Sequence, residues 1–510
     1  MAIEKGLFAR KPLELLLQEM EEGENRLKRV LGPVQLTALG VGAIIGAGIF
    51  VATGEAARNV AGPALMMSYV VAGITCVFAA LCYAEFASMA PVAGSAYTYA
   101  YATLGELFAW IIGWDLVLEY AVGSATVANG WSGYFQSVMR KIGIELPLAL
   151  RESPWRYDGE LGKFISTGSL INLPAIIIVL LVTIVLVKGI SESASFNAAM
   201  VVIKLAAVLF VIGVGAFFID THNWHPFAPY GWSGISFFGH KVAGMTDPGG
   251  KPVGMLAGAA IIFFAYIGFD SVSTHTEEAK NPQKDVPTGI VFSLCICTLL
   301  YICVVAVLTG MVKYDQLDVN AGVSTAFKQK GIGWAEGIIA AAGVAGITSV
   351  LLVMMLSGPR VFLAMARDGL VSKSFFGAVH PKFRTPWKAT ILIGLGVSVG
   401  AGLLPITALL NLTNIGTLLA FVIVCAAVLI MRKKYPNAER PFRCPWVPVV
   451  PILGIGSCLM LMFSLPAENW WRLFAWLALG LVIYFAYGRH NSVMARIAEL
   501  EEHPPVMPPH

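Results

Sequence analysis

Charged residues are scarce in this chain of 510 residues, because Asp, Glu, Lys and Arg together make up only 13% of it. Soluble domains usually carry about 25% charged residues. Hydrophobic residues make up 57% of the chain, and its mean hydropathy is +0.73. The composition therefore predicts an integral membrane protein. The net charge of +4 is too small to indicate a nucleic-acid partner.

Motifs of catalysis and metal binding are also scarce. The sequence contains no H-E-x-x-H, and its G-x-S-x-G match at 396–400 lies inside an apolar stretch, so nothing in it predicts a membrane enzyme. Its 8 cysteines lie in apolar stretches or in one basic loop, so we expect no disulfide, no metal site and no cofactor. Residues 1–33 mix charges of both signs without an apolar core, which excludes a signal peptide and predicts a cytosolic N-terminal segment.

Long apolar stretches dominate the rest of the chain. A spanning helix needs about 20 mostly apolar residues. Twelve windows meet this criterion and predict an all-α protein with twelve transmembrane helices: 36–54, 64–87, 103–131, 173–188, 196–219, 255–275, 287–311, 337–363, 389–404, 408–431, 447–465 and 470–487.

Lys and Arg are distributed unevenly among the predicted loops. Cytosolic loops of membrane proteins carry an excess of these residues. The basic stretches 366–388 and 432–443 therefore place both chain ends in the cytosol, although 140–171 is a basic loop on the predicted outer side. This topology makes 220–253 an extracellular loop and 488–510 a cytosolic tail.

Two of the predicted spans are interrupted by glycine. "GVGAIIGAGIF" (40–50) lies in the first span, and "GAAIIFFAYIGFDSVSTHTEE" (258–278) lies in the sixth. Interrupted segments at matching positions of two halves are a pointer to a transporter binding site. They predict an inverted 5+5 repeat over 34–219 and 254–432, followed by two further helices in 433–487. Close helix packing through Gly42-x-x-x-Gly46 is the alternative explanation of the glycines.

The chain also resembles a known family in several ordered fragments. These are "GAIIGAGIF" (42–50), "CYAEFASMAPVAGSAYTYAY" (82–101), "GWDLVLEY" (113–120), "FFAYIGFDSVSTHTEEAKNPQKDVPTGI" (263–290), "MARDGL" (365–370) and "LTNIGTLLAF" (412–421). In this order they resemble the amino acid–polyamine–organocation transporters, specifically their bacterial branch similar to the cationic amino acid transporters. The resemblance implies the LeuT-like fold, with helices 1 and 6 broken, and amino acid transport in a bacterial cytoplasmic membrane.

The resemblance also implies where a substrate binds. The substrate carboxylate is expected at backbone amides near Ala47 and Gly48, and its ammonium group at carbonyl groups. The expected substrate-binding residues are Ile44, Ile45, Ala47, Gly48, Phe264, Ala265 and Ile267, with Gly46 and Gly268 as the structural breaks. Half-helix ends are suited to this task because they offer both N–H and C=O groups without a buried charge.

Lys204 lies near the middle of the fifth span, too far from either interface for its side chain to reach water. Burial disfavours the charged form of an amine, which makes exchange of its proton possible during transport. In relatives the matching lysine lies against the first broken helix, where sodium-coupled members of the fold hold an ion. We expect Lys204 to couple transport to protons. A purely structural cation bonded to carbonyl groups is the alternative.

Further candidates are carboxylates, one tyrosine and one methionine. Glu119, one turn after Asp115 in the third span, is expected to border the substrate cavity or a proton path. Asp270 and Tyr301 are weaker candidates. Alignment with relatives places Met354 beside the substrate side chain, where a long apolar group occupies the space that a cationic tail needs.

The sequence therefore predicts a secondary active transporter that imports small or medium neutral L-amino acids by proton-coupled alternating access. The alternative is a cationic amino acid or polyamine transporter that works as an exchanger or a sodium-coupled carrier. Membrane lipid is the other expected partner, and no oligomer is required.

Overall fold

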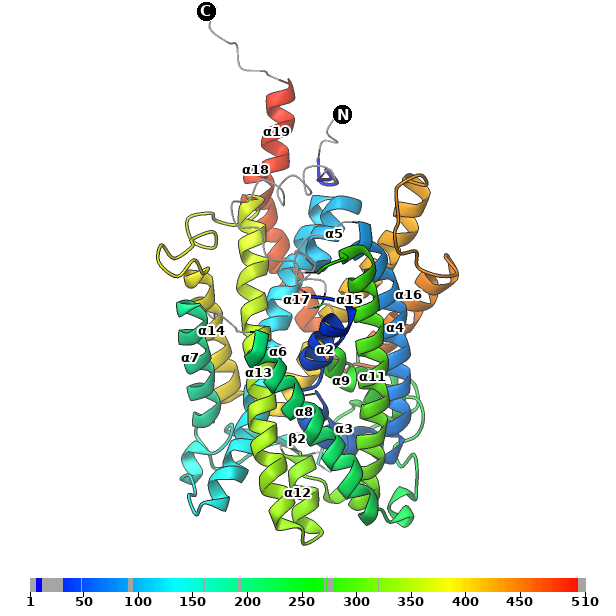
Figure 1. Cartoon of the computed structure of the whole chain (residues 1–510), viewed down its shortest axis with the longest axis vertical. Helices are drawn as coiled ribbons and strands as arrows, with labels where there is room; N and C mark the ends of the chain where they lie inside the picture. The colour runs from blue at the N-terminus through cyan, green and yellow to red at the C-terminus, as the bar shows by residue number, and fades with distance from the viewer. Residues whose placement is uncertain are drawn as a thin grey trace, which may run out of the picture.

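The computed structural model describes residues 6–11, 31–46, 48–89, 95–158, 161–189, 194–269, 272, 279–319 and 321–502. These residues form a bundle of long helices that run roughly along the longest axis of the molecule (Figure 1). The helices are α2 (Pro33–Ile44), α3 (Thr53–Ala56), α4 (Leu65–Met89), α5 (Ser95–Thr103), α6 (Glu106–Lys141), α7 (Leu173–Lys188), α8 (Ala194–Gly215), α9 (Met255–Ile262), α11 (Pro282–Met311), α12 (Gly322–Gln329), α13 (Gly333–Arg367), α14 (Trp387–Leu403), α15 (Ile406–Lys434), α16 (Val449–Met462), α17 (Ala467–Ile483), α18 (Arg489–Asn491) and α19 (Val493–Glu502).

Many of these helices are long and apolar enough to cross a membrane. Within the described residues, 7 segments qualify: Pro33–Met89, Glu106–Lys141, Ala199–Phe218, Pro282–Met311, Gly333–Arg367, Ile406–Lys434 and Ala467–Ile497. Shorter apolar helices are Leu173–Lys188, Met255–Tyr266, Trp387–Leu403 and Val449–Met462. Every window predicted from the sequence overlaps one of these segments. The structure thus agrees with a multi-pass membrane protein.

Packing of the helices brings distant parts of the chain together. α6 lies against α13, α11 lies against both α4 and α2, and α14 lies against α7. α15 contacts α6, α16 and α17. The outer faces stay apolar, as on α7, where Leu181 and Ile184 are both 53% exposed. Apolar side chains on an outer face match a lipid environment better than water.

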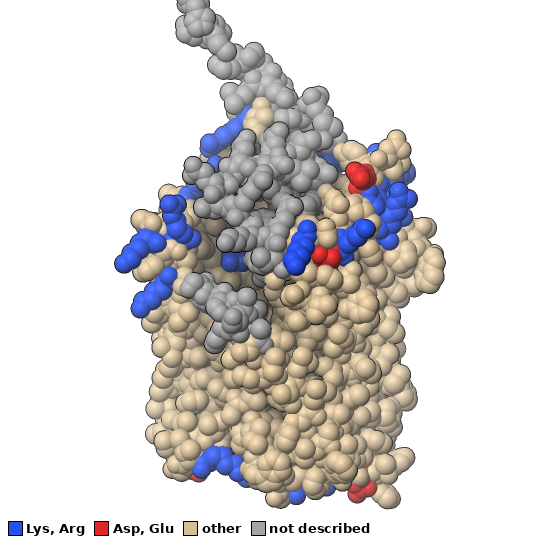
Figure 2. Space-filling view, viewed as in Figure 1, with Lys and Arg blue, Asp and Glu red and all other residues tan. Residues whose placement is uncertain are grey.

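Charged side chains lie mainly at the two ends of this bundle. Figure 2 shows Lys and Arg gathered at the end that carries α19, above a broad belt of other residues. At the same end, residues 6–11 are bonded to the bundle: the Glu106 N–H donates to Ala9 O, and Lys11 Nζ lies 2.9 Å from Asp368 Oδ1. Both members of this ion pair are buried, and Tyr97 donates a further 2.6 Å hydrogen bond to Asp368.

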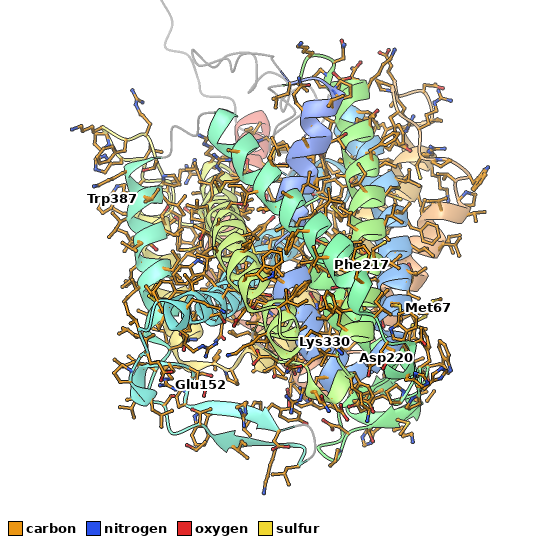
Figure 3. All side chains as sticks on the ribbon, turned by 60° about the horizontal axis from the view of Figure 1, so that its bottom comes forward. Met67, Glu152, Phe217, Asp220, Lys330 and Trp387 are labelled. Atoms are coloured by element: carbon orange, nitrogen blue, oxygen red, sulfur yellow. The ribbon has the colours of Figure 1, made fainter. Side chains whose placement is uncertain are left out.

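Three short antiparallel hairpins lie at the opposite end. They pair β1 (Trp155–Asp158) with β2 (Lys163–Ser166), β3 (Ile235–Phe237) with β4 (His240–Ala243), and β5 (Met245–Thr246) with β6 (Pro252–Val253). Figure 3, in which this end comes forward, shows Glu152, Lys330 and Asp220 around it.

The first and third hairpins are joined through side chains. Lys251 Nζ lies 3.8 Å from the ring centroid of Tyr157, and the Tyr157 hydroxyl donates to Asp247. Burial and the adjacent Asp247 carboxylate raise the pKa of Tyr157.

Candidate functional site

The first interrupted segment is the end of α2. The helix stops at Ile44, Ile45 takes an extended backbone (φ −70°, ψ 110°), and helical structure resumes as a wide turn over Gly48–Ala52. These residues are buried. A helix that stops inside a protein leaves carbonyl and amide groups without helical partners. Ala47, the expected carboxylate-binding residue, lies outside the described residues.

The second interrupted segment follows α9. The helix ends at Ile262 and continues as a tighter turn over Phe263–Tyr266, and the backbone then takes a positive φ at Gly268. The φ of Gly268 is +120°, and an added Cβ would lie 2.9 Å from the carbonyl oxygen of Ala43 in α2. Only glycine fits this conformation at such a close approach. Asp270 lies outside the described residues.

The two interruptions touch each other. A Cβ on Gly48 would lie 2.1 Å from the Cα of Ala265, and a Cβ on Gly46 would lie 2.2 Å from Val350 Cγ2 on α13. The hydroxyl oxygen of Tyr301 on α11 lies 2.8 Å from Ile44 O and 3.0 Å from Ala265 O. Tyr301 therefore joins the two segments through one hydroxyl group.

This contact involves carbonyl groups at which the substrate ammonium group is expected to bind. Carbonyl oxygens of Ile44 and Ala265 accept from Tyr301, and the carbonyl of Phe264 accepts a 3.2 Å hydrogen bond from the Ile267 N–H. The Tyr301 hydroxyl has one proton, so the carbonyl groups of Ile44 and Ala265 share one donor. A substrate ammonium group at either carbonyl would therefore lie next to the Tyr301 hydroxyl.

Lys204 lies beside the first interruption. Its side chain comes from α8, is 1% exposed, and donates a 2.6 Å hydrogen bond to the carbonyl oxygen of Gly42 in the last turn of α2. Gly346 on α13 makes room for it, since a Cβ there would lie 3.2 Å from Lys204 Cγ. Among the described residues Lys204 has no ion-pair partner. The lysine therefore joins α8 to the last turn of α2.

Met354 lies between two helices near this region. It is 6% exposed. A Cβ added to Gly123 of α6 would lie 3.4 Å from Met354 Sδ and 3.5 Å from Thr413 Cγ2 of α15. Met354 follows Val350, the residue that touches Gly46, by one helical turn. Residues four apart share a helix face, so Met354 is on the face of α13 that meets the first interruption.

Glu119 has protein partners away from the interruptions. Its carboxylate accepts hydrogen bonds from the Gly416 N–H at 2.9 Å, from Thr417 Oγ1 at 3.2 Å and from Arg472 Nη2 at 3.0 Å. Arg472 was not predicted from the sequence. The sequence showed only an arginine in the last predicted span, and nothing in it indicated that this arginine contacts Glu119.

Glu55 was also missed. It lies on α3, is 2% exposed, and accepts a 2.9 Å hydrogen bond from Thr407 of α15. A glutamate directly after the first predicted span, 36–54, was the available signal. Among the described residues, no group of three or more His, Cys, Asp and Glu side chains is arranged to hold a metal ion.

Comparison with known proteins agrees with this architecture. The family described as amino acid permease matches residues 31–485. The chain is 47% identical to the branched-chain amino acid permease BcaP of Bacillus subtilis, over 96% of this chain and 98% of that protein. It is 43% identical to the methylthioribose transporter of the same organism, over 96% and 99% of the two chains.

A plant relative is more distant. The chain is 36% identical to the vacuolar cationic amino acid transporter 4 of Arabidopsis thaliana, over 85% of this chain and 68% of that protein. The family and these relatives are permeases and transporters rather than enzymes. The match over nearly the whole length shows that the chain belongs to the amino acid permease family of the amino acid–polyamine–organocation superfamily.

Proposed function

We propose that this protein is a secondary active transporter that imports L-amino acids together with protons by alternating access. The observation that carries the proposal is the contact of two interrupted helices beside a buried lysine. Backbone groups at such interruptions offer N–H donors for a carboxylate and C=O acceptors for an ammonium group. A zwitterion fits this pair of requirements without any buried protein charge.

The proposal includes the LeuT-like fold, with twelve helices and an inverted repeat over 34–219 and 254–432. The interruptions after Ile44 and Ile262 occupy matching places in the first helix of each half. The gathering of Lys and Arg at the end with α19 supports cytosolic N- and C-termini in a bacterial cytoplasmic membrane. Labelling of single cysteines from each side of the membrane tests this orientation.

Protons are the proposed coupling ion because Lys204 Nζ touches Gly42 O where the first helix ends. An ammonium group at that point bonds the carbonyl more strongly than a neutral amine does, because the charge strengthens the hydrogen bond. Loss of the proton therefore weakens the hold on α2 and favours its movement. A lysine at this point supplies a positive charge without sodium.

Small or medium neutral L-amino acids, such as alanine, are the proposed substrates. Met354 is apolar and offers no acceptor for the donors of a cationic tail, and an unpaired buried donor costs about 1–3 kcal/mol or more. The name of the branched-chain permease relative agrees with an apolar side-chain pocket. Cationic amino acids are the second candidate, because other relatives are named cationic amino acid transporters.

Transport in proteoliposomes tests this function. We expect an inward proton gradient to drive accumulation of labelled alanine, with no effect of sodium and weaker competition by arginine or methylthioribose. Lys204→Gln should abolish accumulation, whereas Lys388→Gln, at a residue bonded to the loop carbonyl of Ser374, should retain it. Sodium-dependent uptake, or wild-type accumulation by both Lys204→Gln and Lys204→Ala, would contradict proton coupling through this lysine.

A further inference from the structure

A second cluster of buried charges lies outside the two interrupted helices. Asp115 and Glu119 of α6 are 2% and 4% exposed, and Arg472 of α17 forms an ion pair with Glu119. Two carboxylates and one guanidinium group leave one negative charge in excess when all are ionised. A buried charge without a partner is strongly unfavourable. The cluster therefore requires one further positive charge.

The two carboxylates differ in their hydrogen-bond partners. Glu119 accepts from an amide, a hydroxyl and a guanidinium group, all of which favour its ionised form. Neither oxygen of Asp115 has a hydrogen-bond partner among the described residues, and Nε and Nη1 of Arg472 have none either. A Cβ on Gly416 would lie 1.8 Å from Asp115 Oδ2, so the carboxyl group packs tightly against α15.

Charges from the surrounding helices do not neutralise Asp115. Arg472 is the cation that acts electrostatically on both carboxylates, and the carboxylates act on each other. The remaining charged side chains on the elements packed against α6 are exposed or bonded elsewhere: Arg360, Arg367 and Glu336 on α13, Lys188 on α7, Lys388 on α14, Arg432, Lys433 and Lys434 on α15, and Glu468 on α17.

We propose that Asp115, Glu119 and Arg472 form a second proton-binding site, separate from Lys204, which holds one proton in this conformation. A proton fits better than a metal cation, because the guanidinium group already lies on Glu119 and repels a second ion. The proton belongs to the coupled pair of carboxylates. The hydrogen bonds to Glu119 favour Asp115 as its carrier.

The cluster is linked to the second interrupted segment through α15. Glu119 holds the Gly416 N–H, and two residues earlier Asn414 Nδ2 donates 2.8 Å hydrogen bonds to Ala260 O and Ile261 O at the end of α9. A change of charge in the cluster that moves this part of α15 therefore moves the end of α9. The role in transport rests on the proposed function, but the proton site itself does not.

Infrared spectroscopy of the full-length, substrate-free protein in lipid tests the site directly. A protonated carboxyl group has a C=O stretching band that a carboxylate lacks. We expect such a band at neutral pH, its shift after labelling with ¹³C-aspartate, and its loss in Asp115→Asn. Glu336→Gln, which alters another buried carboxylate, and Lys204→Gln should both keep it.

The isotope label keeps the test valid even when a variant does not fold, because it is applied to the unaltered protein. A band that shifts with ¹³C-glutamate and disappears in Glu119→Gln would also support the cluster, with the proton on its other carboxylate. Absence of the band in the unaltered protein, or its persistence in both Asp115→Asn and Glu119→Gln, would overturn the proposal. Neither infrared result depends on transport. A failure of the proposed function is therefore detected separately, by the transport measurements in proteoliposomes.

Discussion

Gly48 and Ala265 are in backbone contact, because a Cβ on Gly48 would lie 2.1 Å from the Cα of Ala265. This contact joins the two interrupted segments, between the wide turn Gly48–Ala52 and the tighter turn Phe263–Tyr266. Such close approach is open only to glycine. Gly48, a glycine of the first interrupted segment, therefore lies at the proposed binding site.

Replacement of Gly48 by Ala should separate the two segments. We expect loss of alanine transport and of the thermal stabilisation that alanine gives to the purified protein. Gly396→Ala is the matched control, because nothing lies within 4 Å of the added Cβ in α14. It should retain transport and gain up to about 1 kcal/mol from better helix propensity. Equal behaviour of the two variants would contradict the contact.

Replacement of Met354 by Ser should change substrate selectivity. Shortening this side chain opens space between α6 and α15 and adds a hydroxyl acceptor. We expect the ratio of arginine to alanine uptake to rise about tenfold, the effect of roughly 1.4 kcal/mol. Met355→Ser alters the next residue, which points about 100° away around the helix, and should leave the ratio unchanged. An unaltered ratio in Met354→Ser, or an arginine preference in the unaltered protein, would refute the argument.

Replacement of Lys11 by Met should destabilise the end of the bundle that carries α19. The change leaves the buried Asp368 carboxylate with Tyr97 but without its ion-pair partner. Removal of one partner of a buried pair costs roughly 3–5 kcal/mol. We expect a loss of this order in unfolding experiments, and Asp368→Asn in the same chain should recover much of it. Additive losses in the double variant would show that the pair is not coupled.

Asp220 should make local structure at the hairpin end sensitive to acid. Hydrogen bonds from the main-chain N–H and the imidazole of His222 lower the pKa of the Asp220 carboxyl group. The stabilising contribution is complete above the ordinary pKa of an aspartate and disappears as the pH falls through the lowered value. Amide hydrogen exchange of His222 should accelerate over that acidic range, and Asp220→Asn should remove the pH dependence.

A control for this acid effect is Asp315→Asn, at an exposed ion pair with Lys313 elsewhere on the protein. It should leave the exchange of the His222 amide unchanged at every pH. The same acceleration in Asp220→Asn as in the unaltered protein would show that the carboxylate is not its cause.

Local features of the sequence were sufficient for the class of protein. Apolar runs require a membrane, because so few charges leave no water-soluble surface. The same local features predict structural breaks at Gly46 and Gly268, and residue 268 has a positive φ that favours glycine. The burial of Lys204 followed from its distance to either end of an apolar run. These properties depend on composition and spacing along one segment.

Tertiary structure alone decided which groups satisfy each other. The sequence predicted that the carbonyl groups of Ile44 and Ala265 hold the substrate ammonium group, and in the structure the Tyr301 hydroxyl of α11 lies within hydrogen-bond distance of both. Glu119 is predicted to border the substrate cavity or a proton path, and in the structure its partners come from α15 and from Arg472, which lies 353 residues away in the chain. No local pattern specifies such pairs, because they depend on how helices pack after they have formed. The membrane environment determined the helices, and the packing of their side chains determined the charge clusters.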